Sequence, residues 1–470
     1  MKIIGRNREK ALLKSYYESQ HPEFVAVYGR RRTGKTFLIK EFFDNDFFFF
    51  CTGLANGTKH QQLQVFNVAM NKYGSGEYLP QDNWLDAFIQ LSTMIENSPN
   101  GDKKVIFLDE MPWMDTPRSN FLIGLEYFWN SFASSRPDVL LIVCGSSTSW
   151  IVNKLFRNTG GLYNRVTKQM SIKPFTLGET EEFFQDRGIT FNRYQMIESY
   201  MIFGGIPYYL DYFDNEYSLA QNVDMLCFGD TALLRNEYFS LYSTLFNDYE
   251  NHHKVVEALS LKSMGLTREE LITATGLSNG GGFSRILKEL EQSGFINTYA
   301  PFSRKSRGSL YQLTDSFTLF YHKFMKKGNR DAHFWTSNID ASSHRAWSGY
   351  AFEQVCFSHI EQIKEALKIA IVASNVSAWR STSATKGTQI DLVIDRRDQV
   401  INLCEIKYSM SEYSITKAYD QILRERRATF REETKTKKAL HTTMITPYGV
   451  KHNEYWNSIQ SEVTMEDLFK

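Results

Sequence analysis

The sequence predicts an α/β fold divided among several domains. At 470 residues the chain is long enough for about three domains of roughly 150 residues each. Three hydrophobic runs, 24–28, 105–108 and 139–144, each lead into a glycine or polar turn, as buried strands of an α/β sheet do. Two further runs, 389–395 and 400–408, flank a short polar turn and predict a β-hairpin.

The composition excludes several classes of protein. Hydrophobic residues make up 42% and charged residues 23% of the chain, close to globular averages, so disorder cannot be its main state. The 54 basic and 53 acidic side chains give a net charge of +1, so contact with nucleic acid would have to come from local patches. The five cysteines form no CxxC motif, which favours free thiols in a reducing compartment. With no secretory signal and no apolar run of 18 residues, we expect a cytoplasmic protein without a membrane partner.

The segment "GRRRTGKT" follows the first hydrophobic run and precedes a helical pattern. Its spacing is GxxxxGK[ST], that of a phosphate-binding loop, in the strand, loop and helix context that such a loop requires. The glycines let backbone N–H groups face the phosphates, Lys35 would reach the β and γ oxygens, and Thr36 would bind Mg²⁺. We therefore predict that ATP is bound by Gly29, Arg30, Arg31, Arg32, Thr33, Gly34, Lys35 and Thr36.

Polar residues at two strand ends complete this predicted site. Asp109 and Glu110 follow the second hydrophobic run, where the first acid would hold Mg²⁺ through water and the second would polarise the attacking water. Ser146 follows the third run and could touch the γ-phosphate, although small polar residues also end strands for ordinary turn reasons. An acidic pair alone often only caps a helix. Together with the phosphate loop, it predicts a hydrolytic nucleotide site.

Motifs in roughly the first 210 residues resemble, in order, those of the bacterial and archaeal AAA+-like ATPases of the STAND-related group. They are "GRNREKALL", the phosphate loop, "FLDE", "CGSS", "LYNRVTKQMSIKPFTLGE" and "GGIPYYL". The resemblance implies that Arg6 lies near the adenine and that Arg165 acts as an arginine finger or sensor. It also implies an ATPase core at 1–172 and, where apolar residues recur at helical spacing, a helical lid at 173–248.

Residues 249–316 have the order of a winged helix-turn-helix. Thr267 and Glu270 form a capping box that opens a short helix, "GLSNGG" is a turn, and "FSRILKELEQSG" is a second amphipathic helix that could enter a major groove. Two short strands flank the basic tip "SRKSRG", whose cations suit phosphate contact more than base reading. Modules of this kind also serve in packing or regulation. A linker, first helical and then polar, is expected at 317–340.

The predicted C-terminal hairpin carries an unusual group of charges. Glu405 and Lys407 point to the same face because side chains alternate along a strand, and Asp391 lies opposite them on the neighbouring strand. Carboxylates suit Mg²⁺, which can polarise a phosphodiester, and a lysine can steady developing charge. A lysine among acids can also be a plain ion pair.

The same residues resemble the PD-(D/E)XK nuclease superfamily. Asp391 and the triplet from Glu405 to Lys407 match its hairpin motif, and Glu353 lies on the preceding predicted helix, 346–367. The resemblance implies an α/β restriction-endonuclease-like domain at 341–470, although the superfamily includes inactive members. Its metal ligands would be Glu353, Asp391 and Glu405. A following helix carries four cations that could track a phosphate backbone or simply face solvent. They are Lys417, Arg424, Arg426 and Arg427.

The sequence therefore predicts an ATP-binding and ATP-hydrolysing protein that regulates a Mg²⁺-dependent nuclease-like domain acting on DNA or RNA. The predicted catalytic residues are Glu110, Arg165, Asp391, Glu405 and Lys407. The cofactors would be ATP and Mg²⁺, and Thr36 and Asp109 would hold the ion of the nucleotide site. A second copy of the chain or a protein activator could be needed. The alternative is a nucleotide-switched DNA-binding or signalling ATPase whose nuclease-like tail is inactive.

Overall fold

The computed structural model describes residues 2–99, 101–157, 160–246, 248–262, 264–299, 302, 309–328, 331–381 and 388–470. The chain divides into two compact units, Met1–Pro174 and Phe175–Lys470. Each unit has its own hydrophobic clusters. Three cations predicted at the tip of the wing, Arg304, Lys305 and Arg307, lie outside the described residues.

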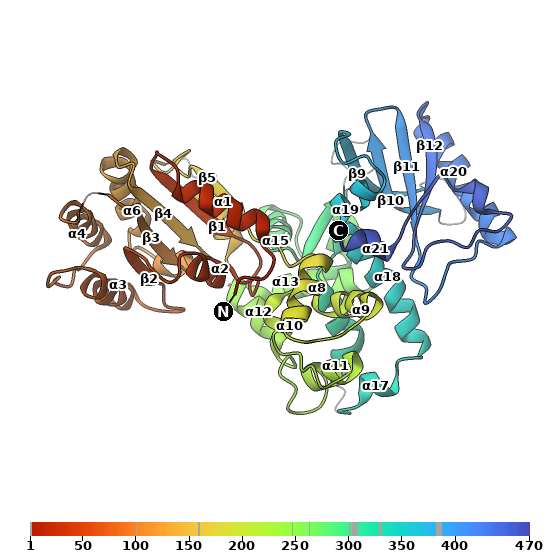
Figure 1. The fold of residues 1–470 in the computed structure, drawn as a ribbon, viewed down its shortest axis with the longest axis horizontal. Coiled ribbons are helices and arrows are strands. Elements are labelled where there is room, and N and C mark those ends of the chain that lie inside the picture. The colour runs from red at the N-terminus through yellow and green to blue at the C-terminus, as the bar shows by residue number, and fades with distance from the viewer. Residues whose placement is uncertain are drawn as a thin grey trace. The chain divides into compact units, whose positions relative to one another are not determined.

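The first unit is built on a five-stranded parallel sheet with the order β2-β3-β4-β1-β5 (Figure 1). Its strands are β1 Glu23–Tyr28, β2 Phe49–Thr52, β3 Lys104–Asp109, β4 Val139–Cys144 and β5 Lys168–Ser171. Because all five strands run in the same direction, the segments that follow β1, β3 and β4 meet at one edge of the sheet. In open parallel sheets this edge is where ligands bind.

Helices cover both faces of this sheet. They are α1 Asn7–Tyr17, α2 Lys35–Phe42, α3 Lys59–Tyr73, α4 Trp84–Glu96, α5 Met111–Met114, α6 Phe121–Ser131 and α7 Thr148–Ile151. Phe24 and Ala26 pack in the cluster that contains α3, α4 and α6, whereas Val25 and Val27 pack in the one that contains α1 and α2. Burial on both faces explains why the strands appear in the sequence as continuous hydrophobic runs.

The second unit begins with a group of helices. They are α8 Leu177–Asp186, α9 Arg193–Phe203, α10 Pro207–Leu210, α11 Leu219–Cys227, α12 Glu237–Leu245 and α13 Tyr249–Ser260. The segment expected as a linker, 317–340, belongs to the same packed body, because it contains α17 Phe334–Ser337 and most of α16 Ser316–Phe320. Phe317, Phe320 and Trp335 are buried. The prediction of a linker is therefore wrong, since α16 packs against α9 and α17 against α11.

A three-stranded antiparallel sheet follows, with the order β6-β8-β7. Its strands are β6 Leu266–Thr267, β7 Ile296–Tyr299 and β8 Leu310–Leu313, and α14 Arg268–Thr275 and α15 Gly281–Gln292 lie between β6 and β7 in the sequence. Thr267 and Glu270 form the expected capping box at the start of α14. The two helices and the two flanking strands expected in this region are present in that order.

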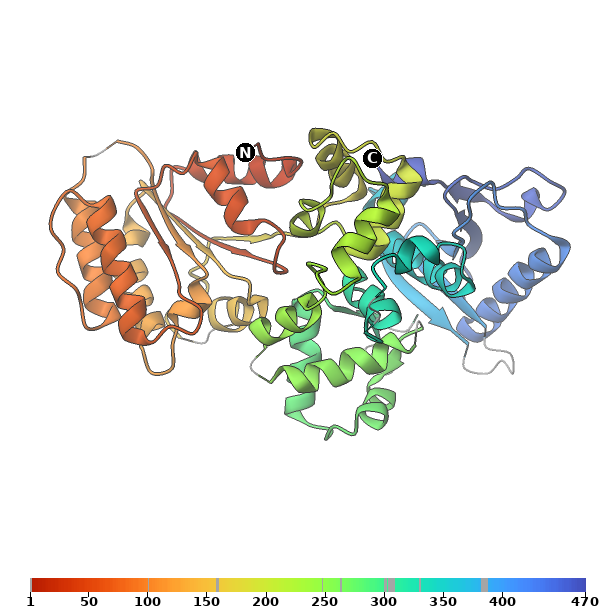
Figure 2. The same cartoon turned by 90° about the horizontal axis from the view of Figure 1, so that it is seen from below.

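The C-terminal part contains a second five-stranded sheet with the order β13-β12-β11-β10-β9 (Figures 1 and 2). Its strands are β9 Ser374–Arg380, β10 Gln389–Arg396, β11 Val400–Ile406, β12 Ala439–Ile445 and β13 Ser461–Val463. Strands β9, β10 and β11 are antiparallel, and β11, β12 and β13 are parallel. The predicted hairpin is β10 with β11. Helix α20 Lys417–Thr434 packs on one face through Leu423 and Phe430.

The helix expected at 346–367 is divided in two. Helix α18 spans Ser342–Ser358, α19 spans Ile360–Ala366, and a last short helix, α21, spans Met465–Leu468. The break lies at His359, whose backbone φ of −116° is not helical. The imidazole of His359 is buried, with Nδ1 on the carbonyl oxygen of Val355 at 2.7 Å and Nε2 accepting from the N–H of Leu177 at 2.9 Å. The residue that ends α18, His359, is therefore also the residue that bonds to the start of α8.

Candidate functional sites

The phosphate loop forms the turn between β1 and α2. Gly29 has a φ of +139°, and a Cβ at this position would lie 2.2 Å from the carbonyl oxygen of Ile172, so only glycine fits. Gly34 has a φ of +82° and directly precedes α2. The tight turn leaves the first N–H groups of α2 without helical partners, as an anion site requires.

Lys35 is buried and folds back over the loop. Its Nζ donates to the carbonyl oxygens of Gly29 at 3.0 Å and Arg30 at 2.8 Å. Burial lowers the pKa of Lys35, and the nearby acids Glu110 and Asp109 act in the opposite direction. Phosphate oxygens would give this ammonium charged acceptors in place of two carbonyls, which makes a stronger interaction.

Asp109 and Thr36 supply neighbouring oxygen atoms at the same edge of the sheet. The Thr36 hydroxyl donates to Oδ1 of Asp109 at 2.9 Å. Burial raises the pKa of Asp109 although this hydrogen bond opposes the shift. A hydroxyl and a carboxylate are oxygen ligands of the kind that Mg²⁺ takes, so these two residues fit the ion that accompanies a bound nucleotide.

Glu110 and Ser146 are joined across the ends of β3 and β4. Glu110 has a φ of +46°, and its Oε2 accepts from both the N–H and the hydroxyl of Ser146, each at 3.0 Å. The two residues that the sequence assigned to water activation and to phosphate sensing are thus in direct contact.

The other residues predicted for nucleotide binding are placed as follows. Nη2 of Arg6 donates to the carbonyl oxygen of Thr33 at 3.1 Å, so Arg6 lies against the loop. Arg30 is buried, and Arg31 and Arg32 are half-buried in the loop itself.

Arg165 is not brought to the phosphate loop of its own chain. It is exposed and precedes β5, whose Lys168 is level with Val25 of the parallel strand β1. Arg165 therefore lies toward the edge of the sheet where β1 begins, whereas the loop follows the other end of β1. The role of Arg165 as an arginine finger or sensor stays a prediction, and as a finger it would act on the nucleotide of a second copy of the chain.

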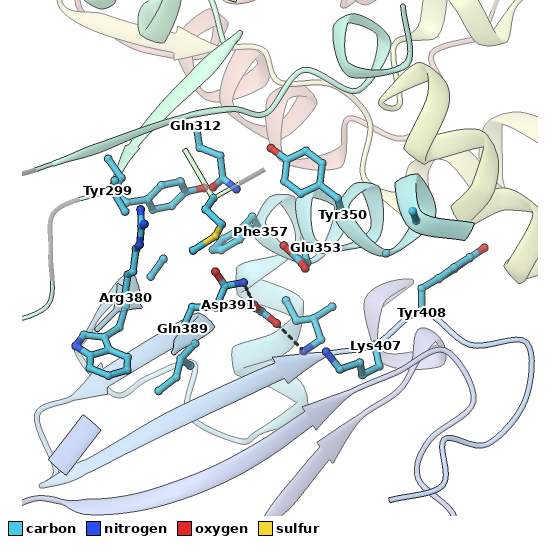
Figure 3. A pocket seen from close by; sticks show the side chains of 18 residues that line it. Tyr299, Gln312, Tyr350, Glu353, Phe357, Arg380, Gln389, Asp391, Lys407 and Tyr408 are labelled. Atoms are coloured by element: carbon cyan, nitrogen blue, oxygen red, sulfur yellow. Dashed lines mark hydrogen bonds between the residues drawn. The ribbon is translucent and has the colours of Figure 1, made fainter. Parts of the chain in front are cut away.

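The second unit contains a pocket of about 360 Å³ beside the predicted nuclease residues (Figure 3). Glu353 enters it from α18, and Asp391 and Lys407 enter it from the second sheet (Figure 3). The opposite wall comes from β7 and β8. Tyr299 and Arg380 lie toward one side and Lys407 and Tyr408 toward the other, with Glu353 and Asp391 between them (Figure 3).

Asp391 reaches the pocket through an irregular part of β10. The pairing of β10 with β9 shifts between Ile390 and Val393, and such bulges change the direction of a side chain. The Asp391 carboxylate accepts from Nε2 of Gln389 and from the N–H of Ile406, both at 3.4 Å. Burial raises the pKa of Asp391, and Lys407 opposes the shift. Burial, followed by the charge of Asp391, raises the pKa of Glu353 to about 8.

Glu405 differs from the other predicted acids. It is buried, does not line the pocket, and pairs through Oε2 with the guanidinium of Arg426. The hydroxyl of Tyr419 donates to the same oxygen at 3.2 Å. Arg426, expected to track phosphates or face solvent, is instead directed at the predicted active-site acid.

The positions of the carboxylates decide whether a metal ion fits in this pocket. Within the described ranges, no three side chains of the His, Cys, Asp or Glu type are grouped so that they could hold one. The predicted set of three ligands is therefore wrong, because Glu405 is engaged by Arg426. Glu353 and Asp391 alone still fit Mg²⁺, which proteins commonly bind through one or two carboxylates together with water and substrate phosphates.

Residues that the sequence did not single out support the predicted acids and the wall of the pocket. Gln389 orients Asp391, Tyr419 joins Arg426 in holding Glu405, and the Tyr350 hydroxyl donates to the carbonyl oxygen of Leu313 at 3.0 Å. Gln389 could have been found from the sequence, because it lies two residues before Asp391 on a predicted strand and residues at this spacing share a face. The others depend on contacts between distant segments, which no local pattern reveals.

Helix α9 links the predicted lid to this pocket. It packs against α18, which carries Glu353. Tyr194 of α9 stacks on Tyr408, the residue after Lys407, with ring centroids 4.9 Å apart and planes 16° apart. Arg193 pairs with Glu466 of α21. The lid helix is therefore part of the same packed body as the predicted nuclease residues.

Comparisons with known proteins separate the two ends of the chain. Residues 5–213 match a family described as an ATPase domain predominantly from Archaea. The N-terminal part of the chain is a P-loop ATPase domain. Residues 317–419 match a family of archaeal and bacterial proteins of unknown function. Because the ATPase match extends to residue 213, it includes α8, α9 and α10 of the second unit.

The chain is also similar to one whole-chain relative and to solved structures. An uncharacterized protein of Methanocaldococcus jannaschii is 24% identical over 438 residues, which cover 90% of this chain and 91% of the relative. The Walker-type ATPase PABY2304 of Pyrococcus abyssi has a TM-score of 0.52 at 15% identity, over 68% of this chain and 96% of that chain. The Aeropyrum pernix ORC2 protein has a TM-score of 0.41 at 14% identity, over 68% and 93%. The Pyrococcus similarity confirms the α/β ATPase fold. Among the described residues, no helix has the length and apolar character needed to cross a bilayer.

Proposed function

We propose that this ATPase controls a phosphodiesterase site in its second unit, which cuts DNA or RNA. The observation that carries the proposal is the contact of α9, a helix within the ATPase match, with α18 and with Tyr408. A nucleotide-dependent movement of the lid would reach Glu353 and Lys407 through these contacts. The nucleotide site would thereby control the reaction in the pocket of the second unit.

At the nucleotide site, each residue would have a separate role. Lys35 and the N–H groups of the loop would hold the phosphates, and Thr36 and Asp109 would hold Mg²⁺. Glu110 would accept a proton from the attacking water once Ser146 releases its carboxylate, and Ser146 could then reach the γ-phosphate. Arg165 would act on the nucleotide of a second copy.

In the pocket of the second unit, the reaction would be hydrolysis of a phosphodiester. The oxygen of water forms a bond to phosphorus, the bond from phosphorus to the leaving nucleoside oxygen breaks, and that oxygen takes up a proton. Lys407 would stabilise the charge that develops on the phosphate, and Gln389 would hold Asp391 in position. Glu353 and Asp391 would hold Mg²⁺, which supplies polarisation of the phosphodiester when bound.

The test compares cleavage and ATP hydrolysis in four proteins. Wild type, Lys35→Ala, Lys407→Ala and Asp391→Asn are incubated with plasmid, linear duplex and single strands in Mg²⁺ or Mn²⁺ with ATP. Asp391→Asn and Lys407→Ala should lose cleavage and keep ATP hydrolysis, whereas Lys35→Ala should lose ATP hydrolysis and the control of cleavage by ATP. Absence of cleavage by wild type in every condition would remove the nuclease proposal.

One observation favours a second candidate function. The ion pair of Arg426 with Glu405 ties up a predicted acid, as expected for a tail that has lost catalysis and serves a nucleotide-switched DNA-binding or signalling ATPase. The same comparison separates the two, because this candidate predicts ATP-dependent binding of nucleic acid by wild type without cleavage.

A further inference from the structure

The pocket of the second unit has two chemically different ends. The charged end consists of Glu353, Asp391 and Lys407, and the aromatic end consists of Tyr299 and Phe357 (Figure 3). Met264 and Leu310 also line the pocket. The rings of Tyr299 and Phe357 lie 5.1 Å apart at 45°. A catalytic site that only needed to grip a phosphate would have no use for an adjoining aromatic end.

The wing strands form a fixed wall of this pocket. Tyr350 of α18 donates to the carbonyl oxygen of Leu313 in β8. Phe302, which follows β7, packs on Phe430 of α20 with centroids 4.9 Å apart. Together with the contact between Tyr299 and Phe357, these interactions hold β7 and β8 against α18 and the second sheet. Residues of these strands therefore line the same pocket as the charged end.

The volume and the lining residues of the pocket favour an unpaired nucleotide over a base-paired duplex. About 360 Å³ lies at the lower end of the range for pockets that take small organic ligands, which suits one nucleotide and is far too small for a base-paired duplex. Aromatic side chains bind unpaired bases by stacking, and every base offers a face for this. Arg380, which is exposed at the rim, suits the phosphate of a neighbouring nucleotide.

We infer that the pocket takes a single unpaired nucleotide of a single-stranded DNA or RNA, with the base in the aromatic end and the phosphodiester at the charged end. The substrate is then a single strand, a strand end or an unpaired loop. This inference rests on the proposed function for its catalytic meaning, but the binding that it describes does not require cleavage.

The test measures binding of the full chain to short fluorescent oligonucleotides by anisotropy, in Ca²⁺ without Mg²⁺. The probes are single-stranded DNA, single-stranded RNA and a blunt duplex of matched length. We expect both single strands, or one of them, to bind at least about tenfold more tightly than the duplex. Phe357→Ala should weaken binding of the single strand about 5- to 150-fold, as loss of one stacked base does. Phe357→Tyr should restore it, because tyrosine keeps a stacking ring.

Two further variants separate stacking from loss of structure. Tyr127→Ala, which removes an exposed aromatic side chain in the first unit, should leave binding unchanged. Arg380→Gln should reduce the slope of log affinity against log salt by about 0.7, the contribution of one phosphate contact in a single strand. Equal or tighter binding of the duplex, no binding of any probe, or unchanged binding by Phe357→Ala would overturn the inference.

The outcome for cleavage is independent of this result. Cleavage of duplex plasmid together with tighter duplex binding would keep the proposed function and overturn the single-strand inference. Binding of single strands that depends on Phe357, without cleavage of any substrate, would support the single-strand inference and overturn the proposed function.

Discussion

The guanidinium of Arg426 forms an ion pair with the carboxylate of Glu405, which is only 2% exposed. Burial raises the pKa of Glu405, and Arg426 opposes this effect. Removing the cation with Arg426→Gln leaves a buried carboxylate with the Tyr419 hydroxyl as its remaining partner. We expect the free energy of unfolding of the second unit to fall by about 2–4 kcal/mol, somewhat below the usual cost of breaking a buried pair because Arg426 is partly exposed.

Denaturant unfolding of matched variants checks this value. Lys417→Gln removes an exposed cation from the same helix and should cost less than about 1 kcal/mol. The double variant Arg426→Gln with Glu405→Gln should recover most of the loss, since no buried charge remains unpaired. If the double variant is as unstable as the sum of the single variants, the two residues are not coupled in the way the structure indicates.

Gly29→Ala should abolish ATP binding. Its Cβ would lie 2.2 Å from the carbonyl oxygen of Ile172, and alanine rarely adopts a φ of +139°. The loop would have to move away from β5, which would change the direction of its N–H groups. Titration with a fluorescent ATP analogue measures the effect. Gly281→Ala is the control, because a Cβ there meets nothing within 4 Å and the residue lies in α15. Unchanged nucleotide affinity in Gly29→Ala would contradict the importance of this turn.

Glu110→Gln should separate ATP binding from ATP hydrolysis. The amide cannot accept a proton from water, so kcat should fall about 100- to 10,000-fold while nucleotide affinity changes little. Steady-state phosphate release and equilibrium binding measure the two quantities. Ser146→Ala keeps the backbone N–H bond to Glu110 and removes only the hydroxyl, so its kcat should change less than tenfold. A kcat for Glu110→Gln near that of wild type would exclude Glu110 as the base.

Tyr194→Ala should uncouple the two proposed activities. The variant removes the ring that stacks on Tyr408 and leaves the phosphate loop untouched. ATP hydrolysis should remain within about threefold of wild type, whereas stimulation or inhibition of cleavage by ATP should be largely lost. Tyr217→Ala, which removes an exposed ring elsewhere in the second unit, is the matched control. Cleavage that responds to ATP equally in both variants would exclude this route.

Local patterns predicted the parts of the fold that are locally determined. Strands β1, β3 and β4 are buried on both faces and appear as hydrophobic runs, and the glycines of the phosphate loop have a fixed spacing. Strand β12 was not predicted because its buried positions include the polar residues Thr442 and Thr443. The hydroxyl of Thr443 hydrogen-bonds that of Ser461, and the backbone N–H of Thr442 donates to the side chain of Gln460. A strand that satisfies polar side chains through tertiary contacts carries no hydrophobic pattern.

The candidate pocket shows the same division. Alternation along a strand predicted that Glu405 and Lys407 share one face, with Asp391 opposite them. Asp391 and Lys407 line the pocket, whereas Glu405 does not. The partner of Glu405 could not be predicted, because Arg426 belongs to a helix whose charged residues all look alike in sequence. The packing of residues 317–340 was missed for a related reason, since the apolar residues of α16 and α17 are too few to form a long periodic pattern.

The buried imidazole of His359 should make the second unit less stable in mild acid. Burial lowers the pKa of His359 to about 4, whereas an unfolded histidine has a pKa near 6.5. Between these values the unfolded chain binds more protons, so the stability contributed by the neutral ring is complete above about pH 6.5 and is lost as pH falls toward 4. From pH 7.5 to 5 this residue should cost about 2 kcal/mol. His359→Gln cannot titrate, and its amide oxygen can still accept from Leu177, so its unfolding free energy should depend less on pH by that amount. Denaturant unfolding at pH 5 and 7.5 measures the difference between the two proteins, and an identical pH dependence would contradict the prediction.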